Sequence, residues 1–164
     1  MLQGIKLKAN PNNHQKTILS QWMGCARYIW NAKVIEDKEQ REKLNSKATK
    51  KYPSVDQTYS KYKNKTSTPW LYQCPSQILR NTVSNWRTTY QNFFKKLCGR
   101  PKLKKKDGRG SVHLTGELFQ FQKGKDGITR LFIGSKTNNI GYLAIKSHKK
   151  YKQPKSLYIK KKRQ

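Results

Sequence analysis

Acidic residues are scarce in this sequence. Only 8 Asp and Glu stand against 37 Lys and Arg in 164 residues, which gives a formal net charge of +29. Repulsion at this charge density opposes compaction unless a polyanion neutralises it. Two-metal catalysis needs carboxylates that converge from several elements, but four of the acids crowd into segment 36–42 and the others are isolated. The sequence therefore predicts a polyanionic partner and no catalytic residue.

Long apolar runs and paired cysteines are missing as well. No stretch approaches the ~20 apolar residues of a membrane span, and the N-terminal residues lack the apolar segment of a signal peptide. We expect a cytoplasmic protein, associated with the nucleoid when bound to DNA, with no membrane contact. Cys25, Cys74 and Cys98 form no CxxC pair, and no histidine falls at metal-ligand spacing around them. Buried, reduced thiols are expected, with no metal and no cofactor.

The N-terminal part predicts a short strand followed by a helix. Residues 2–8 alternate apolar and polar side chains, as in a half-buried strand. Pro11 ends that strand, and Asn12 with Gln15 has the pattern of a capping box. Gly24 inside the helix indicates either a kink or break, or a surface that another molecule approaches closely. The core-facing stripe comprises Ile18, Leu19, Trp22, Met23, Cys25, Ala26, Ile29, Trp30 and Lys33.

A second helix is predicted over residues 75–99. It follows a stretch, 37–68, that begins as a solvated helix end and then becomes rich in lysine and tyrosine, with no defined pattern. Pro75 suits the first turn of the second helix, and Gly99 suits the position just past its last turn. Apolar residues in steps of three and four predict a packing seam against the first helix. The seam comprises Leu79, Val83, Trp86, Tyr90, Phe93 and Leu97.

The opposite face of the second helix carries amides, hydroxyls and arginines but no acid. Arginine forks hold phosphate bidentately while amides and hydroxyls reach ribose, so this face suits a nucleic-acid backbone better than a lipid surface. The nucleic-acid-binding residues predicted here are Gln77, Arg80, Ser84, Arg87 and Gln91, and Asn81, Thr88 and Asn92 complete the face.

Beyond Gly99 the sequence becomes strongly basic and the helical period disappears. Short β-prone pieces alternate with turn sequences such as GKDG and TNNIG, which predicts a small antiparallel barrel or sandwich. A lysine-rich loop precedes them. This loop and the first helix add Arg27, Asn31, Lys102, Lys104, Lys105, Lys106 and Arg109 to the predicted nucleic-acid-binding residues. Six aromatic residues in this part have two alternative roles, stacking on bases or filling the core. They are Phe119, Phe121, Phe132, Tyr142, Tyr151 and Tyr158.

Three stretches resemble, in the same order, the OrfB/TnpB family of transposon-encoded, RNA-guided DNA nucleases. Residues 11–31 are similar to the family's opening helix, with Pro and Gln before a Gly-x-x-Arg-x-x-x-Asn pattern. Residues 69–97 resemble its Trp-Leu, Pro-Ser-Gln and aromatic helix ending in Asn-Phe-Phe. Residues 99–115 resemble its Gly-x-Pro-x-Phe-Lys-x-Lys loop and following strand, with Leu103 in place of the usual aromatic.

The resemblance implies an α+β fold with two parts. Residues 1–10 and 100–164 are expected to form a small antiparallel OB-like β-barrel, the wedge domain. Residues 11–99 are expected to form an inserted helical recognition bundle. In the family this half grips the guide RNA scaffold, target-adjacent DNA and the RNA–DNA duplex. The implied function is a nucleic-acid-binding module, with guide RNA and target DNA as partners and no nuclease activity of its own.

Family members continue into a RuvC nuclease domain and a zinc ribbon, whereas this sequence ends about where the RuvC domain would begin. Two alternatives therefore stay open. The chain is the N-terminal half of a split RNA-guided endonuclease, active with a separate RuvC chain, or it is a basic structural protein of a ribonucleoprotein particle. The RNA, the target-adjacent motif and the oligomeric state have no signature in the sequence.

Overall fold

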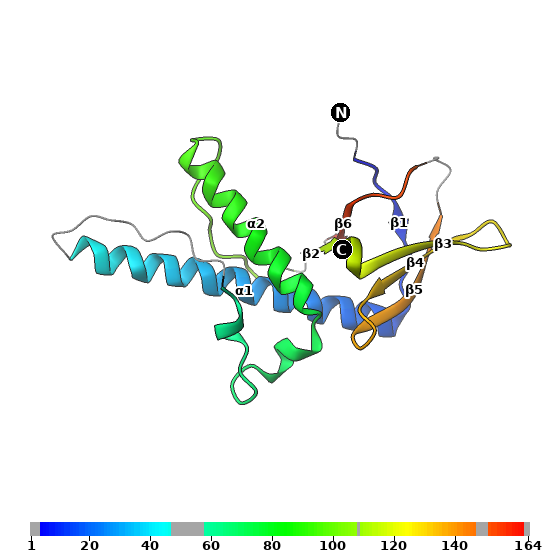
Figure 1. Ribbon diagram of the computed structural model, residues 1–164, viewed down its shortest axis with the longest axis horizontal. Coiled ribbons are helices and arrows are strands. Elements are labelled where there is room, and N and C mark those ends of the chain that lie inside the picture. The colour runs from blue at the N-terminus through cyan, green and yellow to red at the C-terminus, as the bar shows by residue number, and fades with distance from the viewer. Residues whose placement is uncertain (1–3, 47–57, 108, 147–150, 163–164) are drawn as a thin grey trace.

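The computed structural model describes residues 4–46, 58–107, 109–146 and 151–162. A long helix runs along the longest axis, a second helix and two short 3-10 turns pack beside it, and the strands gather near its N-terminal end (Figure 1). The helices are α1 (Asn13–Asn45), η1 (Ser60–Tyr62), η2 (Pro69–Gln73), α2 (Ser76–Phe94) and η3 (Gly116–Leu118). The strands are β1 (Lys8–Ala9), β2 (Gly110–Thr115), β3 (Phe119–Lys123), β4 (Thr129–Gly134), β5 (Asn139–Lys146) and β6 (Ser156–Lys161).

The start of α1 confirms the predicted capping box. The Asn12 side chain accepts the Gln15 backbone N–H at 2.8 Å, and the Gln15 side chain accepts the Asn12 backbone N–H at 3.0 Å. Gln15 Nε2 also donates to the carbonyls of Ile140 and Tyr142, which ties the helix start to β5. The break considered for Gly24 is wrong, because α1 continues through it without interruption.

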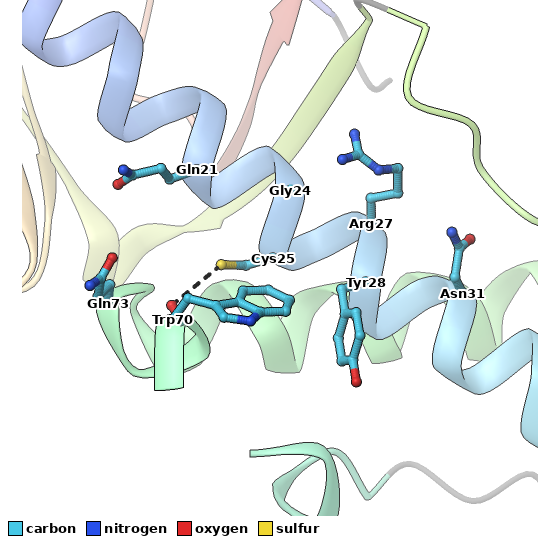
Figure 2. A pocket seen from close by; sticks show the side chains of 8 residues that line it. All are labelled: Gln21, Gly24, Cys25, Arg27, Tyr28, Asn31, Trp70 and Gln73. Atoms are coloured by element: carbon cyan, nitrogen blue, oxygen red, sulfur yellow. Dashed lines mark hydrogen bonds between the residues drawn. The ribbon is translucent and has the colours of Figure 1, made fainter. Parts of the chain in front are cut away.

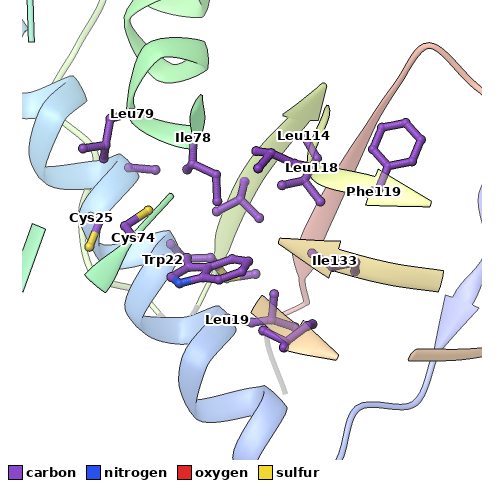
Figure 3. Packing of buried hydrophobic residues seen from close by; sticks show 14 of the residues in the cluster. Leu19, Trp22, Cys25, Cys74, Ile78, Leu79, Leu114, Leu118, Phe119 and Ile133 are labelled. Carbon is purple, nitrogen blue, oxygen red and sulfur yellow. The ribbon is translucent and has the colours of Figure 1, made fainter. Parts of the chain in front are cut away.

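The predicted core stripe of α1 faces α2 and the strands (Figure 3). Trp22 and Ile29 are 2% and 0% exposed. They belong to one continuous buried cluster that includes Leu79 of α2, Leu114 of β2 and Ile133 of β4. Each such side chain contributes roughly 1.5–3 kcal/mol through removal from water. This cluster joins the helices to the strands, and a second, smaller cluster of Trp30, Trp86 and Tyr90 lies between α1 and α2.

The C-terminal end of α2 differs from the prediction. The helix ends at Phe94, several residues before the glycine that was expected to follow it. Lys96 adopts a left-handed conformation with φ 59°, and the backbone N–H groups of Lys96 and Leu97 bond to the carbonyls of Phe93 and Asn92. This local closure stops the helix early. Leu97 is 72% exposed, so its predicted place in the packing seam is wrong.

Asn81 was predicted on the outer face of α2 but is buried. Its Nδ2 donates to the His113 carbonyl at 3.0 Å and to Thr115 Oγ1 at 3.3 Å. Asn81 therefore joins α2 to β2. The buried amide is satisfied by partners far along the chain, which helical spacing alone does not reveal.

The strands form two antiparallel sheets, one with the order β1-β5-β4-β3 and one that pairs β2 with β6. The predicted GKDG and TNNIG turns join β3 to β4 and β4 to β5. The expected closed barrel is not found among the described strands, where β2 and β6 pair with each other only. The first strand, predicted over residues 2–8, is only Lys8–Ala9 among the described residues, and β2 packs against both helices.

Cys25 and Cys74 are buried free thiols, as expected. A hydrogen bond between the two thiols, together with burial, raises the pKa of Cys74 far above its usual range. Cys98 is exposed, which corrects the expectation that all three are buried. It lies just beyond the early end of α2. Within the described ranges, no helix combines the length and the apolar character that crossing a membrane requires.

Candidate nucleic-acid interface

The basic loop, which the structure describes over residues 100–107 and 109, is fixed on α1 by two side chains of that helix. Trp30 Nε1 donates to the Lys102 carbonyl at 2.8 Å. Asn31 Nδ2 donates to the Lys104 carbonyl at 3.0 Å, and Asn31 Oδ1 accepts the Lys104 backbone N–H at 2.8 Å. This two-way bond holds the loop backbone in one register. Asn31, predicted to contact nucleic acid, therefore positions the lysines in this structure.

The first residue of the basic loop is anchored where α1 and α2 meet. Arg100 Nη1 donates to the Tyr90 hydroxyl at 2.8 Å, and its guanidinium lies 4.6 Å from the centre of the Phe93 ring and 3.6 Å from Asp37. Burial, followed by the hydrogen bond and charge of Asp37, raises the pKa of Tyr90 to about 12. Arg100 thus serves as a fixed end of the loop.

The lysines of the basic loop are exposed. Lys102, Lys105 and Lys106 are exposed, and Lys104 Nζ lies 4.0 Å from the centre of the Trp30 ring. Burial against the protein lowers the pKa of Lys104. The Arg109 guanidinium is 3.1 Å from Asp107, which reduces its net charge toward a ligand. The loop therefore presents a row of ammonium groups on a backbone held by α1.

The predicted residues of α2 form one exposed stripe. Arg80, Ser84, Arg87 and Gln91 are exposed and Gln77 is half-buried. Steps of three, four and seven residues bring side chains to the same side of a helix.

The sequence indicated a stripe without acidic residues, but in the structure an acid from another element contacts it. Glu117 of η3 forms an ion pair with Arg80. The pKa of Glu117 is lowered mainly by a hydrogen bond from its own backbone N–H, and next by the hydrogen bond from Arg80. The acid comes from an element 37 residues away, so the helix pattern could not show it. Arg87 has no ion-pair partner within the described ranges, which makes it the more available of the two arginines.

A groove between α1 and η2 adds two aromatic residues that the sequence prediction did not include. Figure 2 shows Arg27 and Asn31 on one side of α1 and Tyr28 on the other, towards Trp70. The rings of Tyr28 and Trp70 meet edge to face at 4.9 Å, and each is 38% exposed. The groove is lined by Gln21, Gly24, Cys25, Arg27, Tyr28, Asn31, Trp70 and Gln73.

Gly24 leaves the backbone open at this groove. A Cβ there would meet Arg27 Nη2 at 3.9 Å, which is ordinary contact. The interpretation of Gly24 as a surface for close approach stays a prediction. The sequence signal for the groove was the polar strip around Gly24 together with Trp70 in the TPW sequence. Their proximity depends on the fold of η2 back onto α1, where Cys25 Sγ lies 3.8 Å from the Trp70 carbonyl.

The predicted residues thus fall into two groups. Direct hydrogen bonds join Asn31 to the basic loop, and Arg27 lies on the same side of α1. The stripe on α2 is the second group, tied through Arg80 to η3. Among the described residues, no three His, Cys, Asp or Glu side chains gather as a metal site would require.

Two comparisons with known proteins bear on these surfaces. The helix-turn-helix domain family OrfB_IS605 matches residues 1–47. The described part of the matched segment, residues 4–46, contains β1 and one unbroken helix, α1. The second similarity is to "Putative RNA-guided DNA endonuclease InsQ" of Escherichia coli (strain K12), with 29% identity over 105 residues. That match covers 64% of this chain and 26% of InsQ, so the chain spans about a quarter of the relative.

The family match covers the segment that contains the first of the three sequence motifs, the capped helix at residues 11–31. The matches and the motif order identify the same group of proteins. These similarities support the resemblance of this chain to the OrfB/TnpB family.

Proposed function

We propose that this chain is a nucleic-acid-binding part of a TnpB-like, RNA-guided system, and that it contacts the backbone of a guide RNA scaffold and of an RNA–DNA duplex. The observation that carries the proposal is the basic loop, whose lysines are exposed while Trp30 and Asn31 hold its backbone. The net charge of +29 supplies the long-range attraction. The similarity to InsQ supports the RNA-guided context.

A held loop binds a polyanion better than a free one. Ordering a flexible segment costs free energy at the moment of binding, and the bonds from α1 remove part of that cost in advance. The lysines then act as point charges near phosphates. Arg87 can hold a phosphate with two parallel N–H bonds, while Ser84 and Gln91 lie beside it for ribose contacts. Such contacts position a strand without reading its sequence.

We also propose that the chain has no nuclease activity of its own. Most of its acidic side chains are engaged by its own basic residues, which leaves them poorly suited to hold catalytic metal ions. The ion pairs are Glu36–Lys61, Asp37–Arg41, Glu42–Lys38, Asp107–Arg109, Glu117–Arg80 and Asp126–Arg130.

Purified protein, given guide RNA and Mg²⁺, should leave a matched DNA target intact. A gel assay of the labelled target checks this. Cleavage that is lost when the chain's own acids are replaced would contradict the proposal. Cleavage that appears only after a separate RuvC-type chain is added would instead support the split-endonuclease alternative.

The stripe on α2 provides the test of backbone binding. The double variant Arg80→Ala/Arg87→Ala should weaken RNA binding equally for unrelated sequences, and the slope of log affinity against log salt should fall by about one per lost phosphate contact. The matched control is Lys38→Ala/Lys43→Ala, which removes the same charge from the exposed far part of α1. Filter binding over a salt series measures both.

A third variant separates the role of Arg80 from the loss of its ion pair. Glu117→Gln releases Arg80 from its acid and should leave RNA binding unchanged or strengthen it. Equal losses for the two double variants would show that total charge alone matters. That result would remove the special role given to α2.

A further inference from the structure

The outer sheet face is the side of the four-stranded sheet that turns away from the core. Strand alternation places successive side chains on opposite faces. Leu131, Ile133 and Leu143 are buried on the inner face and belong to the core, as Figure 3 shows for Ile133. The alternate residues of the same strands, together with Lys8, form the outer sheet face: Lys8, Gln120, Gln122, Arg130, Phe132, Tyr142, Ala144 and Lys146.

Two aromatic rings lie in the middle of this face. Phe132 of β4 is paired in register with Tyr142 of β5, and their ring centres are 5.3 Å apart. Tyr142 is 48% exposed and Phe132 is half-buried. The core cluster includes neither ring. Sequence alone could not tell these two rings from Phe119, which is buried in the core.

The residues around the two rings are amides and cations. Gln120 is paired with Phe132 in register, and Gln122 is paired with Arg130. Lys146 is paired with Lys8 at the other end of the face. The positions that make up the outer sheet face include no acid. The acid that approaches it is Asp126 in the β3–β4 turn, at 2.8 Å from Arg130.

We infer that the outer sheet face is a stacking platform for unpaired bases of a single-stranded nucleic acid. Exposed rings stack on bases of any sequence, the lysines attract the phosphates between them, and the two glutamines reach base edges. A duplex offers no such bases, because its own bases are stacked on one another. A basic partner is repelled by a chain of net charge +29. The inference rests on the proposed nucleic-acid-binding function but assigns residues outside the basic loop and α2.

The test replaces both rings with leucine, as Phe132→Leu/Tyr142→Leu, which keeps the face apolar but removes the stacking surface. Binding is measured by fluorescence anisotropy with three probes of about 12 nucleotides: oligo(U) RNA, oligo(dT) DNA and a mixed-sequence duplex. Affinity for the single strands should fall about tenfold or more, while affinity for the duplex stays the same. The RNA and DNA arms show which single strand the face prefers.

Three controls keep the result interpretable. Tyr142→Phe retains the ring and should bind as the unchanged protein does. Phe94→Leu removes a ring that is 64% exposed at the end of α2 and should leave single-strand binding unchanged. Thermal melting of each variant, measured without nucleic acid, verifies that the sheet is folded; a double variant that melts early is replaced by Tyr142→Leu alone.

Unchanged single-strand affinity in a folded ring variant, with duplex binding intact, overturns the platform and leaves the proposed function standing. Equal losses for single strands and duplex also overturn it, because stacking affects unpaired bases alone. If the unchanged protein binds neither probe type, both the platform and the proposed function are wrong.

Discussion

RNA affinity is expected to fall by about 10³–10⁵ between about 50 and 200 mM salt, provided that roughly six to ten phosphates are contacted. The reason is the release of counterions from the nucleic acid when lysines and arginines replace them. The chain supplies the necessary charge, since 37 basic residues outnumber 8 acids. A filter-binding titration over a salt series measures the slope.

The basic loop should account for part of that slope. Replacing its exposed lysines, as Lys102→Gln/Lys105→Gln/Lys106→Gln, is expected to reduce the slope by up to about 0.9 for each lost contact. The same number of glutamines placed at exposed lysines of α1 serves as the control. A nearly flat salt response of the unchanged protein would show that binding, if present, does not depend on phosphates.

The substitution Glu36→Ala is expected to destabilise the fold by about 3–5 kcal/mol. Lys33 is 1% exposed, and its ammonium lies 3.8 Å from the Glu36 carboxylate and 5.5 and 5.8 Å from the ring centres of Tyr62 and Trp86. Glu36 also accepts a hydrogen bond from the Tyr62 hydroxyl and pairs with Lys61 at 2.5 Å. Its removal leaves a buried cation with less compensation and detaches η1 from α1. Urea denaturation measures the loss.

Two variants make this expectation specific. Glu39→Ala, at an exposed position one turn further along α1, is expected to change stability by less than about 0.5 kcal/mol. Adding Lys33→Met to Glu36→Ala removes the buried charge and should recover part of the stability. A Glu36→Ala protein as stable as the Glu39→Ala control would mean that the buried lysine does not rely on this carboxylate.

Local patterns of the sequence predicted the capped beginning of α1 and the β-prone segments beyond Gly99. The Asn12–Gln15 capping box and the GKDG turn depend on neighbouring residues, so their structure follows from short segments. The early end of α2 also depends on neighbours, but Lys96 takes a left-handed conformation that is uncommon for lysine. The prediction that α2 continues to just before Gly99 was therefore wrong.

Long-range contacts were beyond the reach of those patterns. The bond from Asn31 to Lys104 joins residues 73 apart, and it turns a predicted ligand-binding side chain into one that positions a loop. Barrel closure likewise depends on which strand edges meet, and in this structure β2 pairs with β6 and packs on both helices. The types of residue on the candidate interface could be predicted from the sequence. The residues that they contact could be identified only from the folded structure.

The central claim is that the basic loop, held on α1, is where nucleic acid binds. Acetylation of lysines in the free protein and in its complex with RNA, read by mass spectrometry, tests it directly. We expect strong protection of Lys102, Lys105 and Lys106 in the complex and little protection of Lys38 and Lys43, which are exposed further along α1. Equal protection of both sets, or protection of the α1 lysines alone, would contradict the claim.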